Sequence, residues 1–153
     1  MIIGSNKGVI LRAADIISRE EFLEMIIEAL GIQVDLKSEH PYYMAALKQK
    51  IITKETFGEN YQKPLSKSDA AVVLVRADEY LYGETVTDKQ IEQIINFRIS
   101  DINKVSKARR SYIARCYQLG YLIGHSDGTY MKTRTFQPSQ KISMSTAKLL
   151  VER

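Results

Sequence analysis

The chain has 153 residues, 44% of them hydrophobic and 26% charged, with a net charge of +4 at pH 7. This length can bury the core of a single domain, and no apolar run approaches the ~18 residues that a membrane span needs. The mild positive charge permits an anionic partner without identifying one, and the single cysteine, Cys116, excludes a disulfide framework and a cysteine-built metal site. We expect Cys116 to be a buried packing residue.

Six short helices joined by turns are predicted, over approximately 18–30, 41–50, 66–82, 87–97, 106–119 and 143–151. The first has the clearest signals, because Ser18 and Glu21 form a capping box and Phe22, Ile26 and Leu30 follow at helical spacing. Strands have little support, because the β-branched residues fall inside helical patterns instead of alternating with polar ones. The sequence therefore predicts an all-α fold.

The fourth predicted helix stands apart from the others. It begins at a capping pair, Thr87 and Gln90, and carries three isoleucines at helical spacing. No segment elsewhere in the chain resembles it, so we interpret 84–97 as an insertion into an otherwise repeated pattern.

The repeated pattern consists of an apolar pair, a loop of the form Gly-x3-Gly, and a helix that starts with serine. Its two clear copies contain Gly4, Gly8 and Ser18, and Gly124, Gly128 and Ser143. A weaker copy leads through Ile51 and Gly58 to Ser66, and the last copy has a short insertion around 131–135. Self-similarity of this kind predicts helix-loop-helix repeats within a single domain, over about 1–31, 38–83 and 98–153. The first repeat lacks its first helix, so we expect a longer parent protein.

The order of these parts resembles the S-layer homology domain of bacterial surface proteins. The family pattern has an aromatic-bearing helix, an apolar pair, a glycine loop, a Phe-x-Pro segment and a helix beginning Ile-Ser/Thr-Arg-x-Glu. The last repeat matches it most fully, from Asp101 through Tyr112 and Phe136 to Ser143, and 17–22 gives the helix start in its best form. The resemblance covers nearly all of the chain except about 83–97. No single motif is specific, but three in register are.

The resemblance implies an all-helical bundle with pseudo-threefold symmetry, with no catalytic activity and no cofactor. In such domains the grooves between repeats hold a secondary cell-wall polysaccharide, often one carrying a pyruvate ketal. The implied function is to attach a larger secreted protein, such as an S-layer protein, to the bacterial cell surface. Because the first repeat is incomplete, we also expect an exposed apolar patch beside Phe22 and Ile26, covered by the parent protein or by self-association.

The resemblance also implies which residues line the grooves. The family's helix-start arginine falls on Arg19 in the first repeat, Lys67 in the second and Met144 in the third, where a thioether cannot pair with a carboxylate. The family's tryptophan is absent, so Tyr42 or Tyr43, together with Tyr112, are the candidates for stacking on a sugar. The predicted carbohydrate-binding residues are Arg19, Lys67, Gly4, Gly8, Asp101, Tyr42, Tyr112, Gly124 and Gly128.

Physical chemistry gives a separate reason to consider Arg19. A cation in the first turn of a helix opposes the helix macrodipole, so this arginine is a poor choice for stability alone. Beside free N–H groups, its guanidinium can bind a carboxylate through two parallel hydrogen bonds. The alternative is a solvated surface charge, or a salt bridge to Glu20 or Glu24.

Other functions have weaker support. The segment 104–115 is basic and contains Tyr112, which suits a nucleic-acid surface, but a solvated helix face explains it better and no nucleic-acid motif matches. A protein-interaction or assembly module with degenerate sugar grooves is the third interpretation. His40 and His125 lack the spacing of metal ligands, and no serine or cysteine has the signature of a nucleophile.

Overall fold

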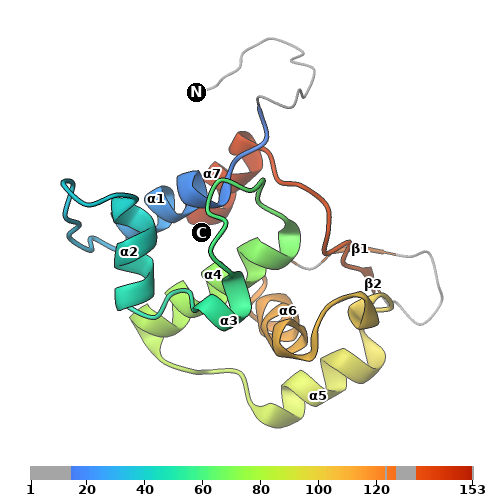
Figure 1. Ribbon diagram of the computed structural model, residues 1–153. Helices are drawn as coiled ribbons and strands as arrows, with labels where there is room; N and C mark the ends of the chain where they lie inside the picture. The colour runs from blue at the N-terminus through green and yellow to red at the C-terminus, as the bar shows by residue number, and fades with distance from the viewer. Residues whose placement is uncertain (1–14, 123, 127–133, 153) are drawn as a thin grey trace.

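The computed structural model describes residues 15–122, 124–126 and 134–152. Within these ranges it contains seven α-helices: α1 (Arg19–Ala29), α2 (Pro41–Lys48), α3 (Lys54–Phe57), α4 (Lys67–Tyr82), α5 (Asp88–Phe97), α6 (Lys107–Leu119) and α7 (Met144–Glu152) (Figure 1). A 3₁₀ turn covers Ile102–Lys104, and the two-residue strands β1 (His125–Ser126) and β2 (Arg134–Thr135) pair antiparallel. The all-α prediction is confirmed. None of the described helices is long and apolar enough to span a membrane.

The six predicted helices are present, and local capping boxes fix the starts of α1, α4 and α5. Ser18, Ser66 and Thr87 each accept a hydrogen bond from the backbone N–H three residues later, and the side chain of that residue accepts one from the cap N–H. These reciprocal bonds satisfy two backbone donors that would otherwise lack a partner. Local sequence therefore suffices to begin these helices.

Two features were not predicted. The single-turn helix α3 begins at Thr53 and is too short to show an apolar period. Strand β2 lies in the insertion around 131–135, so part of that insertion pairs with β1. The pairing depends on Gly124, whose φ is +75° and whose added Cβ would lie 2.7 Å from the carbonyl oxygen of Thr135. Only glycine allows the chain to approach so closely there.

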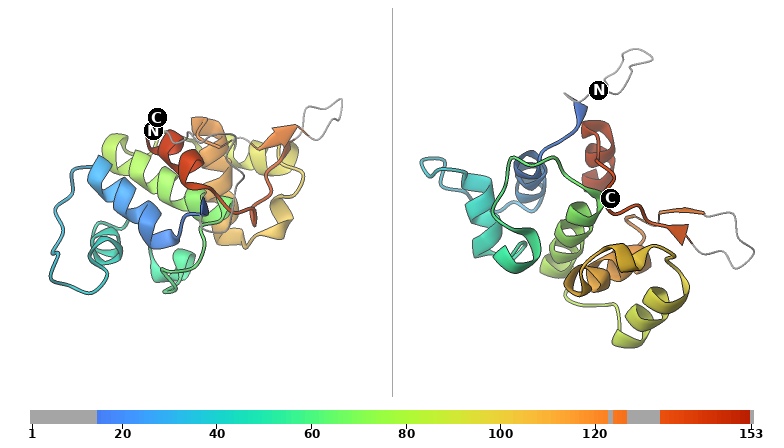
Figure 2. Two further views of the ribbon diagram at one scale, coloured as in Figure 1. Left: turned by 90° about the horizontal axis from the view of Figure 1, so that it is seen from above. Right: turned by 45° about the vertical axis from the view of Figure 1, so that its right-hand side comes forward.

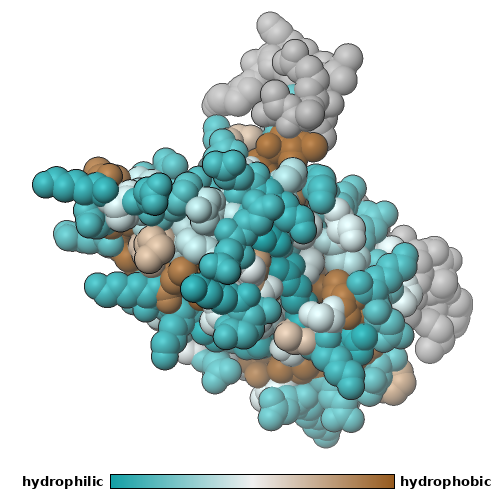
Figure 3. All heavy atoms as spheres, in the orientation of Figure 1, coloured by the Kyte–Doolittle hydropathy of each residue, from teal (hydrophilic) through white to brown (hydrophobic). Residues whose placement is uncertain are grey.

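The helices pack in pairs around a shared core. α1 packs against α2, and α4 packs against α6, while α5 lies on the outer side of α6 (Figures 1 and 2). α1 also contacts α4 and α7. The face shown in Figure 3 is largely hydrophilic, with apolar side chains in small separate areas. The inserted helix α5 thus extends the molecule at one edge instead of entering its centre.

The starts of α1, α4 and α7 meet in a closed ring of backbone hydrogen bonds. The N–H of Ile17 donates to the carbonyl of Ile142 (3.0 Å), that of Leu65 donates to Ile17 (2.8 Å), and that of Ile142 donates to Leu65 (3.0 Å). Each of these residues directly precedes the serine before its helix, and all three side chains are buried. The ring brings three segments that lie far apart in the sequence into one core.

The expected apolar patch beside Phe22 and Ile26 is not present. Phe22 is fully buried and Ile26 is 4% exposed, because α2, α4 and α7 surround α1. Among the described residues, Phe22 and Ile26 therefore do not form the exposed apolar patch that was expected. On α7, by contrast, Lys148 and Glu152 are exposed, as is the apolar Leu149 (65%).

Candidate functional site around the start of helix α1

Arg19 opens α1, and its guanidinium is buried instead of facing solvent. Its Nε and Nη2 donate to the two carboxylate oxygens of Asp69 in α4, at 3.0 and 2.8 Å. Its Nη1 donates to the carbonyls of Phe57 (2.6 Å) and Asn60 (3.4 Å), and the guanidinium lies 4.6 Å from the centroid of the Phe57 ring. The predicted arginine therefore forms a bidentate pair, but with another helix of the chain and not with a glutamate of its own helix.

A second arginine, from α6, shares the same carboxylate. The Nη1 of Arg109 donates to Asp69 and to the hydroxyl of Ser68, both at 2.8 Å, and its Nε and Nη2 donate to the carbonyl of Thr56 at 2.9 and 2.6 Å. The cluster thus joins α1, α4, α6 and the end of α3 around one buried carboxylate. Sequence reasoning missed Asp69, whose only signal was its place in the Ser66 capping box, and it counted Arg109 as part of a basic surface.

The carboxylate of Asp69 is strongly stabilised in its charged form. Burial raises the pKa of this carboxyl, but the hydrogen bonds from Arg19 and the Ser66 N–H, with the charge of Arg109, outweigh burial and hold the pKa below its ordinary value. The side chain is 1% exposed. It is therefore ionised at neutral pH, and the two guanidinium groups leave the cluster with one excess positive charge.

The backbone N–H groups at the starts of α1 and α4 are already bonded. The first two donors of each helix reach carbonyls of preceding loops: Arg19 to Lys63, Glu20 to Tyr61, Lys67 to Gln140, and Ser68 to Pro138. The third donor of each helix reaches its cap serine. The free N–H groups expected beside Arg19 are thus not available to an anion, and that part of the prediction was wrong.

Outside the buried cluster lies a polar and aromatic surface that we call the rim, made of Glu20, His40, Asn60 and Tyr61. The Nδ1 of His40 is 2.8 Å from a carboxylate oxygen of Glu20, and both side chains are 28% exposed. The His40 ring lies 3.8 Å from the Tyr61 ring, which meets Tyr43 edge-on at 4.9 Å. The rim therefore combines ring faces with hydrogen-bonding groups at the surface.

His40 is held in an unusual conformation within the rim. It precedes Pro41 at the start of α2 with φ +54°, in the left-handed region that residues other than glycine rarely occupy. In the neutral ring, the contact with Glu20 places a proton on Nδ1, which leaves Nε2 as a hydrogen-bond acceptor. Among the described residues, Nε2 has no partner. The described chain also has no cluster of three potential metal ligands, so the rim is not a metal site there.

Neither a family model nor a curated protein matches this chain. The geometry of its own residues must therefore support any proposed function.

The remaining predicted site residues are dispersed. Lys67 is half-buried; burial lowers the pKa of its ammonium, while the charge of Asp101 acts in the opposite direction. Asp101 is buried and accepts from the N–H groups of Phe136 and Gln137, both at 2.8 Å, so it fixes the loop before α7. These contacts bring Lys67 and Asp101 into one electrostatic neighbourhood, separate from the pair of Arg19 and Asp69.

The tyrosines and glycines differ in how they are used. The hydroxyl of Tyr42 is 3.5 Å from Glu28, and the guanidinium of Arg115 covers one face of Tyr112 at 4.4 Å. Gly124 allows the close approach between β1 and β2. The other predicted glycines, Gly4, Gly8 and Gly128, lie outside the described residues. The site that the structure assembles most clearly is therefore the Arg19 cluster with the rim above it.

Proposed function

We propose that the chain is a non-catalytic module of the S-layer homology type, which binds secondary cell-wall polysaccharide and holds a larger surface protein on the bacterial envelope. The ring of hydrogen bonds among Ile17, Leu65 and Ile142 carries this proposal. The same backbone hydrogen bond occurs three times and joins the three helices that begin after a serine. Such a cycle is expected of similar repeats arranged around a shared axis. The packing of α1 on α2 and of α4 on α6 supports the same arrangement, with α5 as an insertion.

The binding surface in this proposal is the rim. Sugar rings present C–H faces that stack on aromatic side chains, and hydroxyls that exchange hydrogen bonds with carboxylates and imidazoles. His40 and Tyr61 supply the rings, and Glu20 supplies a carboxylate beside them. Arg19 acts from below, because it holds the carbonyls of Phe57 and Asn60 and so fixes the loop that carries Tyr61. Arg19 is therefore a positioning residue for the rim.

A second region, at the start of α4, supplies a cation. Lys67 is half-buried near Asp101, where partial desolvation strengthens its attraction to a carboxylate such as that of a pyruvate ketal. We therefore propose that Lys67 contributes to the charge-dependent part of binding and the rim to the part that survives added salt.

The direct test is co-sedimentation with purified peptidoglycan sacculi, before and after the wall polysaccharide is stripped. We expect the chain to sediment with intact sacculi and to remain in solution with stripped ones. His40→Ala and Glu20→Gln should each weaken sedimentation, while Glu24→Gln, an exposed glutamate one turn further along α1, should leave it unchanged. Equal sedimentation with stripped sacculi, or none with either, would refute the proposal and favour a protein-assembly role.

The nucleic-acid alternative depends on the basic segment 104–115, and part of that segment has partners within the chain. Arg109 is bound to Asp69, Arg115 donates to Glu79 at 2.6 Å, and Arg110 donates to the carbonyl of Val105. Three of the basic side chains in 104–115 are therefore committed to internal partners. We do not propose nucleic-acid binding.

A further inference from the structure

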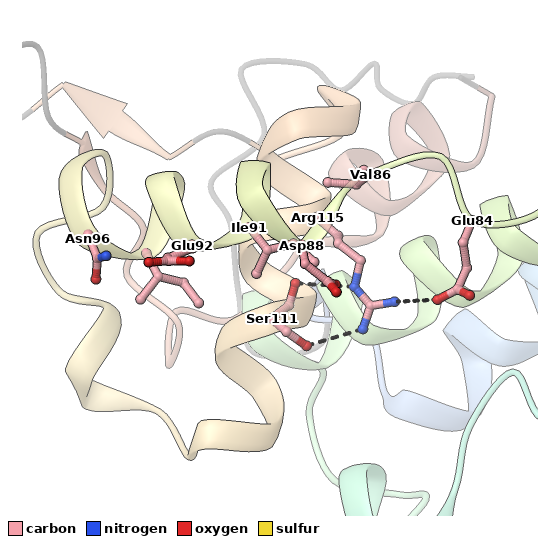
Figure 4. A pocket seen from close by; sticks show the side chains of 9 residues that line it. Glu84, Val86, Asp88, Ile91, Glu92, Asn96, Ser111 and Arg115 are labelled. Atoms are coloured by element: carbon pink, nitrogen blue, oxygen red, sulfur yellow. Dashed lines mark hydrogen bonds and ion pairs between the residues drawn. The ribbon is translucent and has the colours of Figure 1, made fainter.

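The inserted helix α5 encloses a pocket against α6. It has a volume of about 430 Å³, within the range of small-molecule sites. Figure 4 shows Asp88 and Ile91 of α5 directed toward Ser111 and Arg115 of α6. We call this hollow the α5–α6 pocket.

The pocket has an apolar floor and an acidic border. Ile91 and Ile95 lie one turn apart on α5 and are half-buried at the pocket. Asp88 and Glu92 follow the same spacing and are exposed, and Glu84 completes the border from the preceding loop. An aliphatic stem fits such a floor, and its charged end would lie among the carboxylates.

Arg115 also lines the pocket, and its positive charge neutralises the acidic border only in part. Its Nη1 donates to Glu79 at 2.6 Å, and both of these side chains are largely buried, whereas Glu84 is 3.9 Å away and 81% exposed. Within the described residues, neither Asp88 nor Glu92 has an ion-pair partner. The pocket is thus a negative site on a chain whose net charge is +4.

The type of cation follows from the arrangement of the carboxylates. A divalent metal ion needs several oxygen ligands converging on one point, and no group of three acidic or histidine side chains among the described residues can hold a metal ion. The carboxylates are instead spread along the border above aliphatic side chains. An organic cation, which carries its own apolar surface, matches both parts of this lining.

We propose that the α5–α6 pocket binds a small aliphatic amine, with its stem on Ile91 and Ile95 and its ammonium at Asp88 and Glu92. This site is separate from the rim, and the proposal does not depend on wall binding. It assigns a role to α5, the one predicted helix that has no counterpart among the repeats.

The test is an NMR titration of the full chain with hexylammonium, 1-hexanol and hexanoate, which share a stem and differ in charge. We expect hexylammonium to shift the methyl signals of Ile91 and Ile95, and to bind at least about threefold to fivefold more tightly than 1-hexanol. Hexanoate should bind most weakly. Added salt should reduce the advantage of hexylammonium over 1-hexanol, because the border is exposed.

Matched variants locate the ammonium. Asp88→Asn and Glu92→Gln should each weaken hexylammonium binding about threefold to fivefold without changing 1-hexanol binding. Glu152→Gln on α7 removes an exposed carboxylate elsewhere and should change neither. Equal affinity of the unaltered chain for hexylammonium and 1-hexanol would overturn the proposal. So would Asp88 and Glu92 variants that bind hexylammonium as tightly as the unaltered chain does.

Discussion

At the scale of single residues, Asp69 holds three helices together through one carboxylate. Two of its bonds come from Arg19, one from Arg109, and one from the backbone N–H of Ser66. Removing one member of a buried ion pair leaves the others charged and without compensation, which costs more than the pair itself contributes. The cluster is therefore vulnerable at its single acidic member.

We predict that Asp69→Asn lowers the free energy of unfolding by about 3–5 kcal/mol, because two guanidinium groups lose their counter-charge. Urea denaturation followed by circular dichroism measures the change. Glu59→Gln is the control, since the ion pair of Glu59 with Lys54 is long (3.7 Å) and mostly exposed, and its loss should have little effect. A similar midpoint for both variants would contradict the role given to the cluster.

The same carboxylate predicts how stability depends on pH. The pKa of Asp69 in the folded chain lies below the ordinary 3.8, so the folded form holds its proton less tightly than the unfolded form. The stabilisation is complete above that ordinary pKa and is lost as the pH falls through the folded-state pKa. We expect the urea midpoint to decline below about pH 4, and Asp69→Asn to show a smaller decline. Parallel curves for the two proteins would count against this assignment.

Cys116 is buried as predicted, with no exposed surface, and burial raises the pKa of its thiol to about 12. Because the thiolate is the reactive form, we expect the native chain to react with a thiol reagent only as fast as it opens. Adding urea should accelerate labelling in step with unfolding. Rapid labelling of the native chain without urea would show that the helix does not protect the thiol.

At the scale of elements, two separate effects exclude residues other than glycine from position 124, beside the strand pair. The left-handed φ of Gly124 opposes any side chain, and its approach to Thr135 leaves no room for a Cβ. Gly83 has nearly the same φ (+77°) but nothing within 4 Å of an added Cβ. The two glycines therefore share a positive φ and differ in the contact that an added Cβ would make.

We predict that Gly124→Ala lowers the melting temperature clearly more than Gly83→Ala does. The alanine at 83 should cost about 1–3 kcal/mol of backbone strain, because Gly83 has a ψ of −179°, in a region that residues other than glycine almost never adopt. The alanine at 124 must also displace the neighbouring strand. Thermal unfolding followed by circular dichroism compares the two. Equal shifts would mean that β1 and β2 add nothing to the stability of the fold.

The helices could be predicted because their signals are local in the sequence. The contacts between helices could not be predicted, because they join residues that lie far apart in the sequence. Ser18 and Thr87 mark helix starts because the capping bonds lie within one turn, and apolar spacing marks the helices that follow. The partner of Arg19 lies 50 positions away, which no local pattern reveals. Helical spacing indicated Phe22 and Ile26 as core residues of α1. Because the helix is covered from several sides, Leu23 and Ile27 are fully buried as well. The rim could not be foreseen, because His40 and Tyr61 meet only in the folded chain.

At the scale of the whole molecule, the hydrogen-bonded ring ties the N-terminal, middle and C-terminal thirds of the chain together. Each third contributes one donor and one acceptor, so the ring cannot form in part without leaving buried backbone groups unpaired. Unfolding is therefore expected to be cooperative. Circular dichroism and tyrosine fluorescence should report one common urea transition.

α7 ends differently from its two counterparts in the ring. At equal distances from their cap serines, α1 has Leu23 and Ile27, α4 has Ala71 and Val75, and α7 has Lys148 and Glu152. The first four are fully buried, and α1 and α4 pack against α2 and α6 respectively, whereas the two charged residues are exposed. At these two positions α7 therefore presents charged side chains to solvent, where α1 and α4 present apolar side chains to a neighbouring helix.

We predict that the chain is a monomer, and that Lys148→Leu with Glu152→Leu makes it associate. Together with Leu149 the new leucines would form a contiguous apolar strip of the kind that recruits another helix. Sedimentation velocity of both proteins at several concentrations measures this. Stable dimerisation of the unaltered chain would argue that charged residues do not protect this face.

In crystal growth, a terminating face is a surface onto which no further unit is added, and α7 has the character of such a face. An exposed apolar helix face can bind the corresponding helix of another molecule. An assembly grows as long as each added molecule exposes the same face again. Two charges on α7 remove that apolar face, so association cannot propagate from this side. We therefore expect a lattice that incorporates this chain to grow from surfaces other than α7.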